Sequence, residues 1–189
     1  MKLTPNQALS RGFTLIELLI VVIILAILAA IVIPQFANTT NDAREGALDA
    51  NLSTLRSAVE LYKIQHKNTY PATAPTGAAV GCTGAAGATT AGAQALIDQL
   101  TMASDINGNT CSVASPSFSF GPYFRGTIPV EPVNNKGSLA AEIAVTTTGA
   151  KIDPAATVTT GGWAFDSKSG QIVMNSGAPD SKGKKYSDH

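Results

Sequence analysis

The sequence predicts an α+β fold in which a long N-terminal helix packs by its second half on a C-terminal antiparallel β-sheet. Three observations predict this fold class. An unbroken apolar run extends from Leu18 to Ile33. Apolar residues then recur at the three- and four-residue spacing of a helix, and two strand-like segments near the C-terminus flank a turn.

The segment from Phe13 to Ile33 is predicted to be a membrane-spanning helix. About 21 residues in a helix extend about 31 Å, close to the thickness of the hydrocarbon core of a bilayer. A removable secretory signal is the alternative, but its apolar region would be shorter and would end in a small-x-small site. Lys2 and Arg11 precede the helix. They favour a single-pass topology with a cytoplasmic N-terminus.

Residues 35–67 are predicted to continue as an amphipathic helix. Pro34 comes first and should kink or locally unwind the helix, because proline removes one backbone hydrogen bond and clashes with the preceding turn. The following apolar residues form one stripe that should face the core. They are Leu48, Leu52, Leu55, Val59 and Tyr62.

Residues 68–189 should form a head. The prolines of "NTYPATAPTG" end the helix, "GAAVGCTGAAGATTAGA" is read as a surface loop, and "AQALIDQLTMA" as a short helix. Residues 121–135 are punctuated by prolines and should be extended. "AEIAVTT" is strand-like, and "GGWAFDSKSGQIVMNSG" predicts a hairpin whose turn ends at Gly170. Its inward side chains should cover the second half of the long helix. They are Trp163, Phe165, Ile172 and Met174.

The composition argues against catalysis and nucleic-acid binding. Thirteen basic residues balance thirteen acidic ones, and only 14% of residues are charged. With two histidines, His66 and His189, no histidine-rich metal site is expected, and no catalytic residue is assigned. "DINGNT" superficially resembles a calcium loop, but its glycine and its twelfth position do not fit, so an Asn-Gly turn is the preferred interpretation.

The stretch "RGFTLIELLIVVIILAILAAIVIP" resembles the leader and N-terminal helix of type IV pilins and type II secretion pseudopilins. The resemblance covers about Ser10 to Glu45. It implies that a membrane-bound prepilin peptidase cuts after Gly12 and methylates the new N-terminus, Phe13. Residues 1–12 would then be a leader, 13–34 a membrane and filament-core helix half, 35–67 an amphipathic half and 68–189 the head.

Glu17, just inside the apolar start, has two interpretations. A glutamate in the first helical turn can serve the unpaired backbone N–H groups there. The resemblance implies an intermolecular role as well, in which Glu17 pairs with the Phe13 amine of a neighbouring subunit. Such a pair would set the register of packed helices, the best-attested use of a buried charge pair.

The predicted function is structural: the chain polymerises into a filament anchored in an inner membrane, with its head in the periplasm. The Gly-Pro-Tyr run and the Gly-Trp hairpin are similar to the heads of major-pseudopilin-like proteins, which favours a type II secretion pseudopilus. The alternatives are a type IV pilus for adhesion, twitching or DNA uptake, and a monomeric membrane-anchored binding module. The resemblance implies three partners besides other copies: the peptidase, an inner-membrane assembly platform, and minor pilins or pseudopilins.

No cofactor is expected. The Asp-Pro-Trp-Gly type segment common in the major-pseudopilin-like subfamily is absent, so calcium stays open without a recognisable site. Cys82 and Cys111 are expected to form a disulfide. Both follow the membrane helix, on the side that the leader's charges and the resemblance place outside the cytoplasm, where disulfides persist. The alternative is two separate thiols, one of them packed as a small apolar residue.

Overall fold

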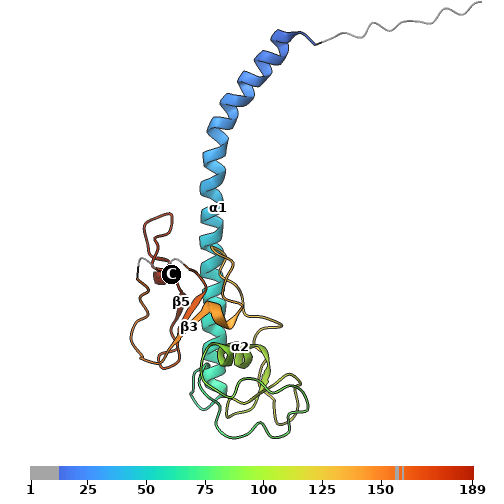
Figure 1. Cartoon of the computed structure of the whole chain (residues 1–189), viewed down its shortest axis with the longest axis vertical. Helices are drawn as coiled ribbons and strands as arrows, with labels where there is room; N and C mark the ends of the chain where they lie inside the picture. Colours follow the sequence, from blue (N-terminus) through green and yellow to red (C-terminus); the bar gives the residue numbers. More distant parts are fainter. Residues whose placement is uncertain (1–12, 156–157, 159) are drawn as a thin grey trace, which may run out of the picture. The chain divides into compact units, whose positions relative to one another are not determined.

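The computed structural model describes residues 13–155, 158 and 160–189, with the helical backbone alone for residues 34–38. The chain divides into two units, residues 1–40 and 41–189. Helix α1, Leu15–Gln65, contributes to both (Figure 1). The second unit also contains helix α2, Ala93–Thr101, the two-residue strands β1, Ala103–Ser104, and β2, Thr110–Cys111, and two short 3₁₀ helices.

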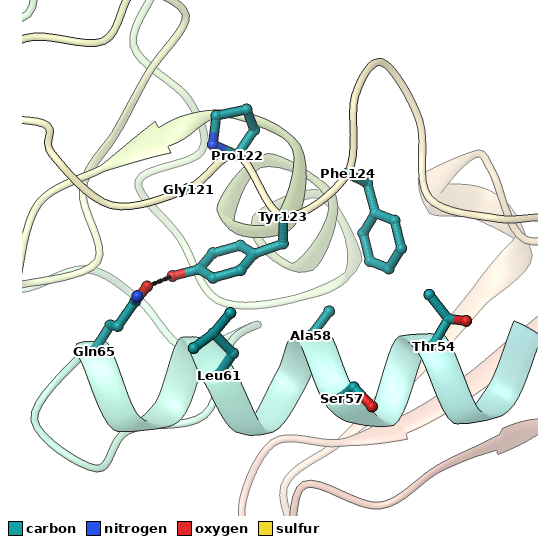
Figure 2. Close-up of a pocket in the computed structure, with 9 residues that line it drawn as sticks. All are labelled: Thr54, Ser57, Ala58, Leu61, Gln65, Gly121, Pro122, Tyr123 and Phe124. Atoms are coloured by element: carbon teal, nitrogen blue, oxygen red, sulfur yellow. Dashed lines mark hydrogen bonds between the residues drawn. The ribbon is translucent and has the colours of Figure 1, made fainter.

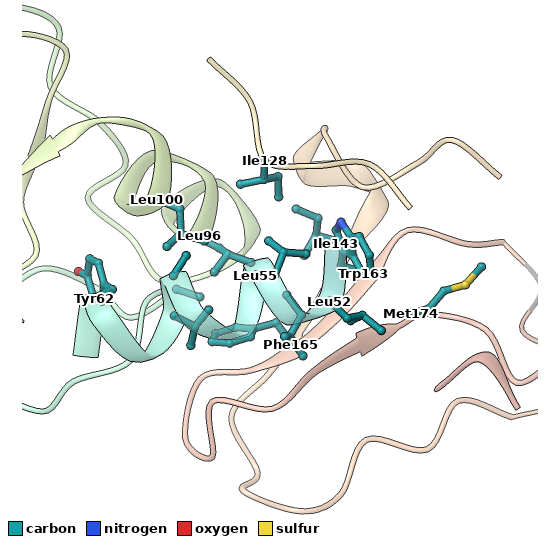
Figure 3. Close-up of a cluster of buried hydrophobic side chains, with 14 of the residues drawn as sticks. Leu52, Leu55, Tyr62, Leu96, Leu100, Ile128, Ile143, Trp163, Phe165 and Met174 are labelled. Atoms are coloured by element: carbon teal, nitrogen blue, oxygen red, sulfur yellow. The ribbon is translucent and has the colours of Figure 1, made fainter. Parts of the chain in front are cut away.

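The core of the second unit forms around one face of α1, as the sequence predicted. The five stripe residues from Leu48 to Tyr62 are all buried. Figure 3 shows side chains of α2 and of the β-sheet converging on this face of the helix. Leu96 and Leu100 of α2 pack there, and so do Trp163 and Phe165 of the sheet. The predicted short helix is therefore confirmed, and so is the predicted cover of α1 by the side chains of the hairpin.

The three-stranded sheet consists of β3, Ile143–Thr146, β4, Trp163–Asp166, and β5, Ile172–Met174. The hairpin of β4 and β5 is antiparallel, with Trp163 opposite Met174. The remaining pairing differs from the prediction, because β3 runs parallel to β4. Strands β3 and β4 are joined by residues 147–162, a connection of the length that parallel neighbours require. The sheet is mixed rather than antiparallel.

Helix α1 ends slightly before the predicted boundary. The sequence placed the end at Lys67 and attributed it to the following prolines. The helix in fact stops at Gln65, and Lys67 and Asn68 both have positive φ values, 54° and 62°. The Asn68 N–H donates to the carbonyl of Lys63 (3.0 Å), a closing bond of the kind that satisfies the last helical carbonyls. The backbone thus turns away before any proline is reached.

The hairpin turn has the glycine that the sequence placed there. Gly170 has φ 75°, and its N–H donates to the carbonyl of Asp166 (2.8 Å). A Cβ atom at this position would lie 2.1 Å from the ring of Tyr70. Glycine is therefore required twice, for the left-handed backbone and for the close approach of the tyrosine.

Candidate functional site

The start of α1 holds the residues to which the sequence gave the main functional role. Thr14 precedes the helix, and its N–H and its hydroxyl both donate to Oε2 of Glu17 (2.9 and 2.7 Å). The Glu17 N–H lies 3.3 Å from the Thr14 hydroxyl oxygen, which accepts from it. This reciprocal pattern is a capping box, so Glu17 does serve the helix end within its own chain. Within the described part of the chain, Oε2 accepts both of the hydrogen bonds made to the Glu17 carboxylate.

Phe13, the predicted methylation site, is 80% exposed and precedes the helix. Gly12, the predicted cleavage position, and the rest of the predicted leader lie outside the described residues. The pairing of Phe13 of one copy with Glu17 of another involves two chains, and a single chain does not test it. The pairing therefore stays a prediction.

The first part of α1 presents its apolar side chains outward. Residues Leu15–Ile33 form a helix that is long and apolar enough to cross a membrane, and none of it is buried within the chain. On a protein in water, a continuous exposed apolar surface of this kind marks a contact with a membrane or with another protein. The segment therefore needs either lipid or other apolar chains around it. The backbone remains helical through Pro34, and the kink expected there stays a prediction.

The predicted disulfide is present. Cys82 and Cys111 are bonded, with their Cα atoms 5.6 Å apart. Cys111 is fully buried and packs with Ala103 and Phe118 in a small cluster separate from the main core. The bridge joins the Gly/Ala/Thr-rich loop to strand β2. Backbone bonds reinforce this contact: Ser112 N–H donates to the Ala85 carbonyl (2.9 Å).

The "DINGNT" segment is a turn between β1 and β2, as preferred from the sequence. Oδ1 of Asp105 accepts hydrogen bonds from the backbone N–H groups of Asn107 and Asn109 (2.8 and 2.9 Å). Oδ2 of Asp105 accepts one from the side-chain amide of Asn109 (2.9 Å). The carboxylate is thus used within the turn. Among the described residues, no group of three or more His, Cys, Asp or Glu side chains is arranged to hold a metal ion.

Asp166 is the most heavily hydrogen-bonded carboxylate of the head. It is fully buried at the end of β4. It accepts hydrogen bonds from Thr148, in the connection after β3, and from Ser169, in the hairpin turn. Burial alone would raise the pKa of Asp166, but backbone and hydroxyl donors from Ser169, Gly149 and Thr146 hold that pKa well below its usual range. This carboxylate organises the hairpin turn and the connection after β3. Its oxygens face internal donors rather than a ligand.

His66 and Ser104 form a buried pair that the sequence analysis missed. The His66 ring stacks on Tyr62 at 3.8 Å, and its Nε2 lies 3.0 Å from the Ser104 hydroxyl. Both residues are buried, so a substrate has no access to the hydroxyl and the pair is structural. Burial lowers the pKa of His66, which favours the neutral ring. The sequence held a signal, because His66 lies four residues after Tyr62 and extends the apolar stripe.

An open groove lies between α1 and the segment after residue 120, with a volume of about 440 Å³. Figure 2 shows Leu61 and Ala58 of α1 facing the rings of Tyr123 and Phe124 across it. The Tyr123 hydroxyl donates to the side-chain oxygen of Gln65 and closes one end. Leu61 is 46% exposed. The groove is defined by Thr54, Ser57, Ala58, Leu61, Gln65 and residues 121–124.

Comparison with known proteins bears on the N-terminal part of the chain. Residues 8–33 match the family model described as the prokaryotic N-terminal methylation motif. The chain carries this motif. It brings together the predicted cleavage position Gly12, the methylation position Phe13 and Glu17, and it confirms the resemblance of this segment to type IV pilins and type II secretion pseudopilins.

The chain is similar over part of its length to curated proteins of both kinds. It is 43% identical over 58 residues to the type IV narrow pilus major component PilA5 of Thermus thermophilus, covering 31% of this chain and 50% of that protein. It is 39% identical over 62 residues to the type II secretion system core protein G of Pseudomonas aeruginosa, covering 33% and 43%. The protein G of Pectobacterium carotovorum is 36% identical over 63 residues, covering 33% and 40%.

The chain thus spans half or less of the length of these relatives. No solved structure matches it significantly. The relatives' names describe pilus and secretion-system components, in line with the prediction that the chain is not an enzyme.

Proposed function

We propose that this chain is a structural subunit that polymerises into a filament and is held in an inner membrane before assembly. The observation that carries the proposal is the methylation motif at the start of an apolar helix that the chain itself leaves uncovered. A bilayer covers such a helix in the single subunit, and neighbouring helices cover it in a polymer. The proposed function needs no cofactor and is structural rather than catalytic.

The proposed maturation is cleavage after Gly12 by a prepilin peptidase, followed by methylation of Phe13. The intact mass and N-terminal sequence of the protein purified from its native membrane test this step. The expected product lacks residues 1–12 and carries one added methyl group on Phe13. A native chain that retains Met1, or one cut beyond the apolar helix, would refute the maturation.

Glu17 has two roles in this proposal, and one substitution separates them. In its own chain the carboxylate completes the capping box through Oε2. In the filament it would also pair with the Phe13 amine of a neighbour, where an unmatched charge between packed helices costs about 3–5 kcal/mol. Glu17→Gln keeps an oxygen acceptor for the capping box but removes the charge.

Sheared-filament yield, relative to total membrane-bound subunit, measures the role of Glu17. We expect Glu17→Gln and Glu17→Ala to be processed and inserted normally but to assemble poorly, with Glu60→Gln as an exposed control on the same helix. Normal assembly of Glu17→Gln alone would leave Glu17 only its capping role. A stable membrane-bound monomer that functions without processing or Glu17 would favour the anchored binding module instead.

Between the two kinds of filament, we propose a type II secretion pseudopilus, with the assembly platform and minor pseudopilins as partners. The similarity to the two secretion-system protein G chains and the Gly-Pro-Tyr and Gly-Trp segments of the head support this choice. The similarity to a narrow-pilus component keeps a type IV pilus as the second candidate. Deletion of the gene should retain folded exoproteins in the periplasm. Loss of surface filaments, twitching or DNA uptake with normal secretion would identify the pilus.

A further inference from the structure

The segment of residues 180–189 folds back onto helix α1, and we call it the closing segment. Ser181 donates from its backbone N–H and from its hydroxyl to the carboxylate of Glu45 (2.8 and 2.7 Å). Nη2 of Arg56 donates to the carbonyl oxygen of His189 (2.9 Å). Figure 1 shows this segment, which ends at the label C, beside α1. Polar contacts therefore hold the segment on the helix.

The ring of His189 lies between two carboxylates. Its Nδ1 is 2.8 Å from Oδ1 of Asp49 on α1, and its Nε2 is 3.2 Å from Oδ2 of Asp180. The side chains of His189 and Asp180 are only 7% and 3% exposed. An ionised carboxylate can only accept hydrogen bonds, so both ring nitrogens have to donate. Only the protonated ring carries an N–H on each nitrogen.

Asp180 does not supply the proton for this contact. Burial alone would raise the pKa of Asp180, but the backbone N–H groups of Lys184 and Lys182 donate to its Oδ1 (2.7 and 2.8 Å). Together with the His189 ring they hold the pKa of Asp180 below its usual value. The carboxylate therefore stays ionised, and its Oδ2 faces the ring as an acceptor.

Other titratable and charged groups surround the ring. The hollow beside it has a volume of about 320 Å³ and is lined by further acidic and basic side chains, which are Asp42, Glu45, Lys182 and Lys184. The Tyr186 ring stacks on the His189 ring with centroids 5.9 Å apart, and Arg56 lies at the His189 carbonyl. Asp188 pairs instead with Lys151 (3.0 Å). The ring nitrogens themselves face Asp49 and Asp180, so these two carboxylates determine which protonation state fits.

We propose that the closing segment is a pH-sensitive clasp, attached to α1 while the His189 ring is protonated and released when the ring becomes neutral. The neutral ring keeps one N–H and turns the lone pair of its other nitrogen toward a carboxylate, so one attractive contact becomes repulsive. A histidine in an unfolded chain binds this proton below about pH 6.5. Attachment is therefore strongest in mild acid and weakens at higher pH, once the ring in the folded head loses its proton. Release would uncover the buried carboxylate of Glu45.

Hydrogen exchange, followed by mass spectrometry in full-length protein kept in detergent, tests the clasp. The N–H of Ser181 reports attachment directly, because its acceptor lies on α1. Between about pH 6 and about pH 8.5, exchange in the closing segment should accelerate about tenfold or more after correction for the intrinsic effect of pH. This is the scale of one lost hydrogen bond to a charged group. Exchange of the Gly170 N–H, which donates to Asp166 in the hairpin, should not accelerate.

Two substitutions distinguish the proton on His189 from a purely structural contact. His189→Gln binds no proton, so exchange in the closing segment should be fast at both pH values. Asp49→Asn offers Nδ1 either an acceptor or a donor, so attachment should no longer need the protonated ring and the pH response should largely disappear. Asp188→Asn is the matched control, an exposed carboxylate paired with Lys151, and should keep the full response. Wild-type fluorescence of Trp163 identifies variants with a folded head.

Each outcome supports or overturns the clasp. Acceleration in the wild type and in Asp188→Asn that is absent from His189→Gln and Asp49→Asn supports it. Exchange that pH leaves unchanged in the wild type overturns it, and so does a full pH response in His189→Gln. A full response in Asp49→Asn overturns the placement of the ring between two carboxylates, on which the inference rests. Filament yield and processing play no part in these measurements, so the clasp and the proposed function can fail separately.

Discussion

Replacement of Asp166 by asparagine should lower the free energy of unfolding of the head more than replacement of any exposed carboxylate does. The side chain keeps its size but loses its charge. Its carboxylate accepts from the backbone N–H groups of Thr148, Gly149 and Ser169 at 2.7 to 3.2 Å. The hydroxyl groups of Thr146 and Ser169 donate to it as well, at 2.9 and 3.0 Å. An amide cannot accept from all of these donors.

The expected loss follows from these bonds. Hydrogen bonds to a charged group contribute about 1.5–3 kcal/mol each, and a buried donor left unsatisfied costs about 1–3 kcal/mol. Because neighbouring bonds are not additive, two lost bonds set a realistic scale of about 3–5 kcal/mol for the free energy of unfolding. For a unit of this size, that corresponds to a fall in the melting temperature of about 6–20 °C.

Trp163 provides the assay, because it is the single tryptophan, is fully buried and lies on the same strand as Asp166. Its fluorescence reports unfolding of the head in full-length protein kept in detergent. Asp153→Asn is the matched control, since Asp153 is exposed and its ion pair with Lys185 lies on the surface. Equal melting temperatures for Asp166→Asn and Asp153→Asn would refute the role given to Asp166.

Acid provides a second arm of the same experiment. The pKa of Asp166 is lowered in the folded head, so its stabilising contribution is present above the unfolded value of about 3.9 and is lost as the pH falls below it. The gap in stability between the wild type and Asp166→Asn should therefore narrow between about pH 4 and pH 2. A gap that stayed constant over this range would contradict the charge-based explanation.

Three further outcomes follow from the head. Replacement of both Cys82 and Cys111 by alanine should lower the free energy of unfolding by about 3–4 kcal/mol, matching the effect of reducing the wild type; an unchanged denaturation midpoint would refute the restraint. Because burial lowers the pKa of His66, the unfolded chain binds protons below about pH 6.5 that the folded head does not, so stability should fall between pH 7 and pH 5. His66→Gln should flatten that profile; an equal slope would show that other groups set it. A calcium chelator should leave the melting temperature unchanged, and a clear decrease would reveal a metal site.

The helical part of the fold was predictable because its signal is local. The stripe from Leu48 to Tyr62 depends only on spacing along one helix, and all five side chains are buried as expected. The hairpin was equally local, since its turn and both strands lie within one short segment. The disulfide could be predicted because the sequence offers a single pair of cysteines and the resemblance implies an oxidising compartment.

The direction of β3 and the buried carboxylates could not be predicted in the same way. Strand composition does not encode whether neighbours run parallel, and the connection of residues 147–162 decides it. From the sequence, a glutamate between two prolines would be expected to be exposed to solvent. Glu131 is instead fully buried, and its carboxylate accepts hydrogen bonds from the backbone N–H groups of Val133 and Asn134. Asp166 had a partial signal, because an aspartate at the start of a turn commonly accepts backbone N–H bonds.

The arrangement of apolar residues in α1 bears on what could drive polymerisation. The head uses the stripe that begins at Leu48 for its own core and leaves residues 15–33 entirely uncovered. In the proposed filament these residues would move from lipid into a bundle of similar helices. Lipid tails are as apolar as leucine, so this transfer gains little hydrophobic free energy. The balance must come from close helix packing, from the Glu17 pair and from contacts between heads. A helix that is apolar on all sides also has no register of its own, so in the proposed filament a polar pair at Glu17 would be the feature that sets the position of one helix relative to the next.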